Sequence, residues 1–203
     1  MKMYSKVKSL GINGIETFAV TVECDLSSGM PKFDIVGLPD AVVMESRERV
    51  RATIKNCNLK FPVSRITVNI APADIKKEGA MYDLPVFVAI LKSSGQIKGN
   101  IDDCAFIGEL SLDGEIRRAS GVLPMIIEAK EQSIKTVFVP FQNACEGSVV
   151  DGVDVLPVNH VKDVLAHISG EKIIEPVKYE LIEETHDEYN IDFSDVKGQQ
   201  SAK

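Results

Sequence analysis

The sequence predicts a mixed α/β domain in which strands alternate with helices. Apolar residues recur at every second position over residues 18–26, which indicates a strand with one buried face. A helical pattern follows over residues 40–58, and a short apolar strand comes next at residues 66–70. Strands that lead into helices and back into strands need parallel crossovers. We expect these crossovers to combine with an early antiparallel hairpin in one mixed sheet with packed helices.

The first part of the chain carries clear turn and helix signals. A turn over residues 27–31 leads into strand character over residues 32–38, which ends at Pro39. Asp40 is then placed to accept a backbone N–H at the start of a helix. The apolar residues of that helix, which include Val50, recur at helical spacing and predict its buried side.

The middle of the chain predicts a buried helix and a second turn. Asp83 is expected to be the N-cap of a helix over residues 84–91, and Pro85 is tolerated in its first turn. This helix is apolar nearly all round, so it should be buried. Asp113-Gly114 lies between two short strand segments and is a strong hairpin signal.

The last third predicts a helix over residues 121–132, strands at 136–140 and 153–158, and a final helix that stops at Gly170. We therefore expect one domain over residues 1–170. Residues 171–203 read as a polar linker without an apolar face that could dock on the domain.

Composition limits the classes of function. No apolar run approaches the ~18 residues that span a bilayer, and the first residues lack a signal-peptide pattern, so we expect a cytoplasmic domain with no membrane partner. The net charge is −7, and residues 171–203, with nine acidic and four basic residues, hold −5 of it. The nearly neutral body does not indicate an indiscriminate nucleic-acid binder. The four cysteines are widely spaced, which predicts reduced thiols and no metal site.

Three long segments resemble one family. Residues 28–56 (SGMPKFDIVGLPDAVVMESRERVRATIKN), 66–91 (ITVNIAPADIKKEGAMYDLPVFVAIL) and 106–125 (FIGELSLDGEIRRASGVLPM) are similar to the N-terminal domain of the magnesium-chelatase-like AAA+ ATPases of the YifB/ComM type. The resemblance covers residues 3–203. That N-terminal domain is itself similar to the proteolytic domain of Lon. The resemblance therefore implies a Lon-proteolytic-domain-like, or ChlI-like, fold for residues 1–170.

The end of the chain adds to the resemblance. Residues 192–203 (DFSDVKGQQSAK) are similar to the segment that opens an AAA+ cassette, which implies that Val196, Gly198 and Gln199 lie near a nucleotide. No G-x-x-x-x-G-K-[ST] loop occurs in the chain, so we expect no ATP hydrolysis and no cofactor in this fragment. For a longer parent, the resemblance implies ATP, Mg²⁺ and a hexameric ring that assembles through the AAA+ module.

The resemblance also implies that the domain is not catalytic. Lon cuts peptides with a serine and a neutral lysine that takes the proton of the serine hydroxyl. The serine position falls here on Met81, and the lysine position falls on Leu123. The nearest basic residues, Arg117 and Arg118, cannot release a proton near neutral pH. We therefore expect no catalytic residues, although peptide binding without cleavage stays open.

Two groups of basic residues are the candidate contacts to DNA or a partner. Arg47, Arg51 and Lys55 recur every four residues on the first helix, and Lys76 and Lys77 lie in a charged loop. Such a stripe can contact phosphates, or it can be a solvated face paired with nearby acids.

ComM-type relatives act on DNA as branch-migration helicases in natural transformation, so the resemblance implies a role in DNA processing. The alternatives are a peptide-binding or residual Lon-like peptidase domain, and a metal-chelatase-type subunit.

Overall fold

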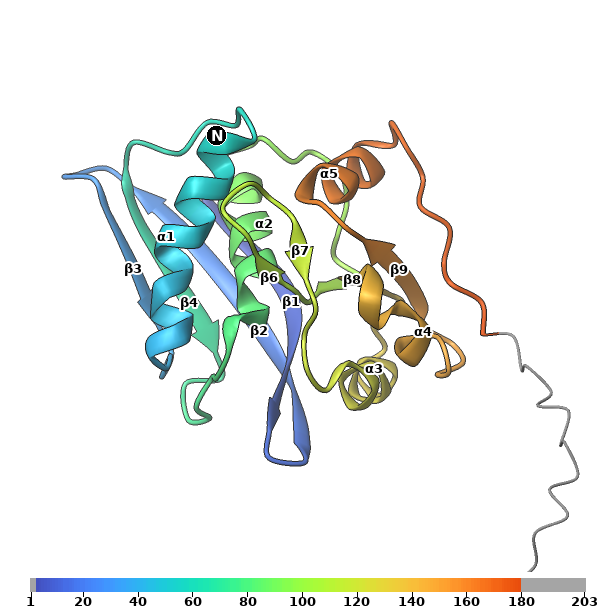
Figure 1. The fold of residues 1–203 in the computed structure, drawn as a ribbon. Helices are drawn as coiled ribbons and strands as arrows, with labels where there is room; N and C mark the ends of the chain where they lie inside the picture. Colours follow the sequence, from blue (N-terminus) through green and yellow to red (C-terminus); the bar gives the residue numbers. More distant parts are fainter. Residues whose placement is uncertain (1–2, 180–203) are drawn as a thin grey trace, which may run out of the picture.

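The computed structural model describes residues 3–179 and confirms the mixed α/β class (Figure 1). The described residues form a seven-stranded sheet in the order β3-β4-β2-β1-β5-β8-β9. Its strands are β1 (Tyr4–Asn13), β2 (Glu16–Ser27), β3 (Lys32–Val36), β4 (Arg65–Ala71), β5 (Cys104–Phe106), β8 (Thr136–Pro140) and β9 (Asp154–Val158). β2 pairs antiparallel with both β1 and β4, and every other neighbouring pair is parallel.

The two predicted early strands, β2 and β3, are not neighbours, because β4 lies between them. β1 and β2 form an antiparallel hairpin, but β1 was not predicted from the sequence. The reason lies on the buried side of β1, where small and polar residues replace the usual aliphatic ones. Ser5 Oγ donates to the carbonyl of Ala89 at 2.8 Å, and Ser9 Oγ donates to the carbonyl of Phe106 at 2.8 Å. Because these hydroxyls are satisfied by backbone acceptors, the strand is buried without an alternating apolar pattern.

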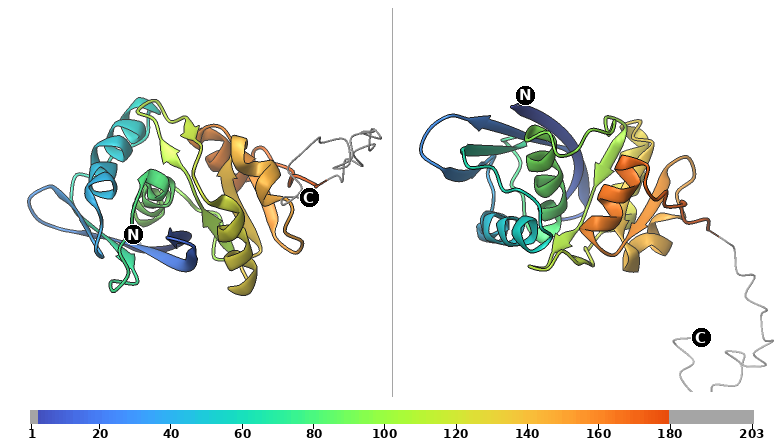
Figure 2. Two further views of the ribbon diagram at one scale, coloured as in Figure 1. Left: turned by 60° about the horizontal axis from the view of Figure 1, so that its bottom comes forward. Right: turned by 90° about the horizontal axis from the view of Figure 1, so that it is seen from above.

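The helices divide into two groups, as the two further views show (Figure 2). They are α1 (Ala41–Asn56), α2 (Asp83–Ser93), α3 (Val122–Glu131), α4 (Ala144–Gly147) and α5 (Val161–Ser169). α1 and α2 pack against each other, and α2 lies against β1 and β2. α3 packs against α4 and also against β1 and β2, and α5 contacts β9. Among the described helices, none is long and apolar enough to cross a membrane.

The predicted helix ends are confirmed where local chemistry fixes them. Asp40 is the N-cap of α1, and its carboxylate accepts the N–H of Val43 at 2.7 Å. α5 ends at Gly170, whose φ of 77° is a left-handed conformation that glycine adopts without strain. The Asp113-Gly114 turn joins a short antiparallel hairpin, β6 (Glu109–Leu110) with β7 (Ile116–Arg117). The buried character of α2 is also confirmed, because every residue from Asp83 to Leu91 is buried.

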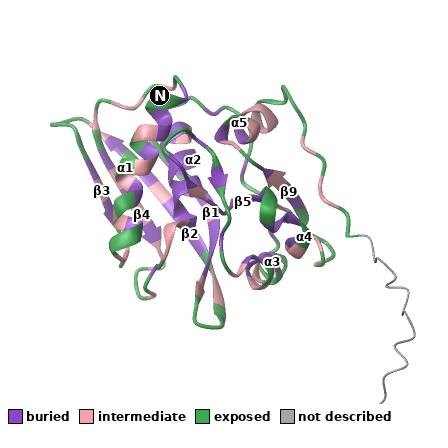
Figure 3. Cartoon of the chain, in the orientation of Figure 1, coloured by how far each residue is buried: buried purple, intermediate pink, exposed green. Residues whose placement is uncertain are grey.

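Strands β1–β4 bury one face and leave the other face polar and partly open (Figure 3). Glu23 lies at the centre of this open face. Its carboxylate accepts hydrogen bonds from Tyr4 at 2.8 Å and Asn69 at 3.0 Å, and it lies 3.2 Å from the Lys6 ammonium. The hydrogen bond from Asn69, followed by that from Tyr4, lowers the pKa of Glu23. Buried and more exposed residues therefore alternate along β2 and β4 because only one face of this part of the sheet is covered.

The segment after Gly170 does not behave as an undocked linker over its first nine residues. Ile174 and Val177 are partly buried and pack against the core. The backbone N–H of Val177 donates to the carbonyl of Val155 in β9 at 3.0 Å. Two isolated aliphatic residues give no periodic signal, so the sequence did not predict this contact.

This contact predicts a difference between two truncated chains. A chain that ends at Tyr179 should melt like the full chain, whereas a chain that ends at Gly170 should melt several degrees lower. Loss of two partly buried aliphatic side chains costs about 1–3 kcal/mol, and about 1 kcal/mol shifts the Tm of a domain this size by roughly 2–4 °C. Thermal melting followed by circular dichroism measures the difference. Equal midpoints for both truncated chains would show that residues 171–179 add no stability.

Candidate functional site

The loop before α2 holds the position where the Lon-like fold would carry its nucleophile. Met81 and Tyr82 lie in a 3₁₀ turn (Ala80–Tyr82) that leads directly into α2, and both are buried. The backbone fixes this turn, because the N–H of Gly108 donates to the Met81 carbonyl at 3.0 Å and the N–H of Leu84 donates to the Gly108 carbonyl at 3.1 Å. A thioether cannot serve as an acyl nucleophile. Backbone hydrogen bonds therefore fix the turn, and position 81 carries no hydroxyl that could attack a peptide bond.

The second half of a peptidase dyad is also replaced by an apolar side chain. Leu123 lies in the first turn of α3, and its side chain is partly exposed. Leu123 has no group that could take a proton. At the two positions that the resemblance aligns with the peptidase dyad, Met81 and Leu123 supply neither a hydroxyl nor an amine.

Asp83 is not the N-cap of α2, which corrects the sequence prediction. The N-cap position is Tyr82 and makes no side-chain cap bond. Asp83 is instead fully buried in the first turn, where its Oδ2 lies 2.6 Å from Nε of Arg49 and accepts the backbone N–H of Leu110 at 3.1 Å. The hydroxyl of Ser46 donates to Oδ1, and Nη2 of Arg49 donates to the same oxygen at 3.1 Å.

Burial is the largest influence on the Asp83 carboxyl and raises its pKa, while the hydrogen bonds from Arg49 and Ser46 oppose the rise. The carboxylate therefore depends on its donors, which come from α1 and from β6. No local pattern in the sequence indicates the role of Arg49, because its partner lies 34 residues away.

The structure also corrects the prediction for Lys77, because its buried side chain is not available to DNA. Its side chain is fully buried, and its ammonium donates to the carbonyl of Ile75 at 2.7 Å. The backbone of Lys77 explains the burial. Its N–H donates to the Leu38 carbonyl at 3.1 Å, and its carbonyl accepts the N–H of Asp40 at 3.0 Å, so the residue is held beneath the start of α1. Loss of hydration lowers its pKa.

The other loop lysine is exposed but has an acidic neighbour. The Lys76 ammonium lies 2.7 Å from the Glu78 carboxylate, and both side chains are more than half exposed. An exposed pair of this kind contributes little stability. It also reduces the positive charge that the loop offers to a phosphate.

The basic stripe of α1 is brought together as the spacing predicts. Arg51 and Lys55 are exposed and Arg47 is half-buried, with its Nε donating to the carbonyl of Met44 at 3.0 Å. The Arg51 guanidinium lies over the ring of Phe61, 5.1 Å from its centroid. Within residues 3–179, these three side chains show no ion pair with a nearby acid, and Glu45 pairs with Arg49 instead.

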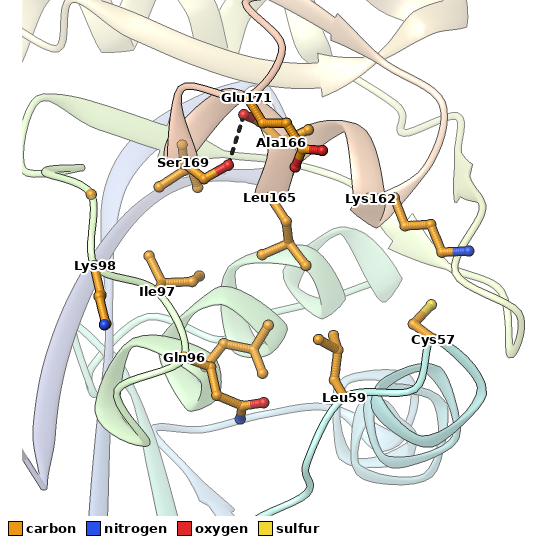
Figure 4. Close-up of a pocket in the computed structure, with 13 residues that line it drawn as sticks. Cys57, Leu59, Gln96, Ile97, Lys98, Lys162, Leu165, Ala166, Ser169 and Glu171 are labelled. Carbon is orange, nitrogen blue, oxygen red and sulfur yellow. Dashed lines mark hydrogen bonds between the residues drawn. The ribbon is translucent and has the colours of Figure 1, made fainter.

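An apolar cleft that the sequence reading missed lies between α2, α5 and the end of α1 (Figure 4). Its volume is about 820 Å³. Leu59, Ile97 and Leu165 point into it, and Lys98 and Lys162 lie at opposite sides. Because the lining comes from three separate regions of the chain, no local motif could have indicated it.

The structure adds no site at the residues predicted to lie near a nucleotide, or at metal-binding side chains and cysteines in the described part of the chain. Val196, Gly198 and Gln199 lie outside the described residues. Within the described part, no group of three or more His, Cys, Asp or Glu side chains could hold a metal ion. The four cysteines are free thiols, and burial raises the pKa of Cys24 to about 11.

The fold defines a mixed α/β domain, built on a seven-stranded and mostly parallel sheet. Residues 22–143 match the family model described as subunit ChlI of Mg-chelatase. The match covers more than half of the chain, so this chain belongs to the ChlI family of Mg-chelatase-like proteins.

Relatives support this assignment over most of the chain. This chain is 36% identical to the competence protein ComM of Haemophilus influenzae over 195 residues, which cover 94% of this chain and 38% of ComM. It is 35% identical to YifB of Escherichia coli, with 94% of this chain and 37% of YifB covered. The similarity to the Lon protease of Buchnera aphidicola is weaker, at 23% identity over 72% of this chain and 20% of that protease. The chain thus spans less than two fifths of the length of these relatives.

We predict that Asp83→Asn strongly lowers stability, because an amide has one acceptor oxygen and would leave Arg49 and other buried donors without partners. Breaking a buried pair in this way costs about 3–5 kcal/mol. Glu45→Gln is the matched control, since Glu45 is the exposed partner of the same arginine and its loss should cost at most about 0.5 kcal/mol. Urea unfolding measures both values. Similar small losses in the two variants would contradict the structural role of Asp83.

We predict that Lys77→Met leaves the Tm at neutral pH no lower than that of the parent. The folded-state pKa of Lys77 lies below its ordinary value of 10.5, so the native state binds fewer protons than the unfolded state between those two values. The stability contributed by this group therefore rises as the pH increases through that window. Melting at several alkaline pH values should show this rise in the parent and its loss in Lys77→Met. A Tm that falls by several degrees at pH 7 would show that the ammonium is needed for folding.

Proposed function

We propose that this chain is the non-catalytic N-terminal domain of a magnesium-chelatase-like AAA+ ATPase, and that it contacts the DNA backbone through α1. Family membership supports the first part, and the relative named as a competence protein supports a role in DNA processing. In this proposal the longer parent binds ATP and Mg²⁺ in its AAA+ module, forms a hexameric ring in the cytoplasm and moves branched DNA during natural transformation.

The observation that carries the DNA contact is the basic face of α1. Arg47, Arg51 and Lys55 lie on it without ion-pair partners in the described part of the chain, while Arg49 turns inward to Asp83. A guanidinium that stacks on a ring, as Arg51 does on Phe61, keeps its N–H donors at the ring edge for a phosphate. Because basic residues at this spacing share one helix face, they can reach successive phosphates.

The contact should be weak in a single copy. Three or four basic residues release few counterions, which corresponds to non-specific dissociation constants of about 10⁻⁴ to 10⁻⁶ M and a strong dependence on salt. A ring presents several copies of the face to one DNA molecule and multiplies the effect of each weak contact. Weak binding by one domain is therefore compatible with a role in an assembled ring.

A second candidate is peptide binding without cleavage. The apolar cleft favours it, because apolar side chains line a concave surface and lysines flank it (Figure 4). Nothing in the described residues favours a role in metal chelation.

The DNA contact is tested by a charge reversal on α1. Fluorescence anisotropy with labelled single-stranded and branched DNA at low salt should show binding that weakens about tenfold or more in Arg51→Glu/Lys55→Glu. Lys130→Glu/Lys135→Glu is the matched control, because it changes the net charge equally at exposed lysines on and after α3. Equal weakening in both variants would indicate a general charge effect, and unchanged binding in the α1 variant would remove this face from the contact.

A further inference from the structure

The two edges of the main sheet differ in how they are protected. At one edge, the N–H of Val177 donates to the carbonyl of Val155, so the chain itself covers part of β9, and Pro157 removes an N–H from that strand. At the other edge, β3 pairs only with β4, and in the described part of the chain no strand lies on its outer side (Figure 1). The backbone of β3 therefore offers unpaired donors and acceptors to another strand.

The side chains of β3 alternate between a buried and an open side. Phe33 and Ile35 are buried, and Phe33 lies against Phe61 with ring centroids 6.1 Å apart. Lys32, Asp34 and Val36 face the open side of the sheet, where the Lys32 ammonium lies 2.9 Å from the Asp34 carboxylate. The open side therefore carries one positive, one negative and one apolar side chain in succession.

This order is complementary to itself when the strand is reversed. If a second copy pairs antiparallel with Phe33 opposite its own counterpart, Lys32 of each copy lies opposite Asp34 of the other. Opposite residues in such a pair have Cβ atoms about 4.5–5.5 Å apart, and opposite charges there are favourable. Val36 then lies level with Met30 of the other copy, and both are exposed apolar residues in the single chain, at 45% and 87%.

The neighbouring registers are unfavourable. A shift of the second copy by two residues in either direction places Asp34 opposite Asp34 or Lys32 opposite Lys32, and like charges at opposite positions are destabilising. A shift by one residue would put the buried side of one strand on the open side of the other. Among these registers, the charge order favours the one with a two-fold axis at Phe33.

We propose that β3 is an interaction surface for a second copy of this chain, and that two copies join through antiparallel β3 edges into one continuous sheet. The interface is isologous, since each copy contributes the same strand. It uses one short strand, so it is smaller than the about 1,200–2,000 Å² of a stable interface, and a single pair of domains associates weakly. This surface is independent of the basic face of α1.

The test uses charge variants that separate contacts between chains from contacts within one chain. Sedimentation velocity over a concentration series should show self-association of the parent, and an about fivefold or larger loss in both Lys32→Asp and Asp34→Lys. Each single variant places like charges opposite each other in its own dimer. Circular dichroism melting should show that both variants are folded.

The two single variants are complementary to each other, although each has lost its own Lys32–Asp34 pair. In a mixture, the chain with acidic residues at both positions lies opposite the chain with basic residues at both positions, so association should return. The double variant Lys32→Asp/Asp34→Lys should also self-associate, because it restores opposite charges. Recovery in the mixture supports the proposal, since mixing cannot restore a contact within one chain. A parent that stays monomeric at the highest concentrations, or association that ignores these charges, would overturn it.

Discussion

The arrangement of α1 and α2 depends on the contacts that the buried carboxylate of Asp83 makes with its donors. A charge without water needs several donors to be tolerated, and here they come from Ser46, Arg49 and the N–H of Leu110. Because these donors belong to α1 and β6, the carboxylate joins α1, α2 and the small hairpin at one point. The same interaction turns Arg49 inward and leaves the next arginine of the helix, Arg51, in solvent.

The contacts around Asp83 also explain how the turn before α2 keeps its path with a methionine at position 81. The turn at Met81 is held by backbone hydrogen bonds to Gly108, and Asp83 anchors the helix that follows. Neither contact needs a hydroxyl at position 81. A thioether can therefore occupy this position while the loop keeps its path.

The sheet has two different halves. β1–β4 pair through antiparallel and parallel contacts and leave a polar face open around Glu23, whereas β5, β8 and β9 are parallel and more fully buried. The chain's own residues near Val177 cover part of the edge of the parallel half. The mixed half keeps an open face and an open edge, and it also carries α1, so the proposed DNA contact and the proposed β3 contact both lie in this half.

Local patterns by themselves determined the elements whose stability is local. The alternation of β2, the N-cap at Asp40 and the glycine stop at Gly170 are properties of neighbouring residues, and the structure confirms them. The i, i+4 spacing likewise placed Arg51 and Lys55 on one helix face. The similarity of long segments, rather than any single motif, indicated the family.

The tertiary structure decided every feature that depends on distant partners. β1 was missed because the acceptors of Ser5 and Ser9 lie 84 and 97 residues away. The sequence predicted Asp83 as a helix N-cap and Lys77 as an exposed contact residue. Contacts with the region of α1 bury both side chains. The cleft and the open edge of β3 exist only once separate segments have packed. A buried polar group needs hydrogen-bond partners. Here those partners are distant in the sequence, so no local sequence pattern indicates the contact.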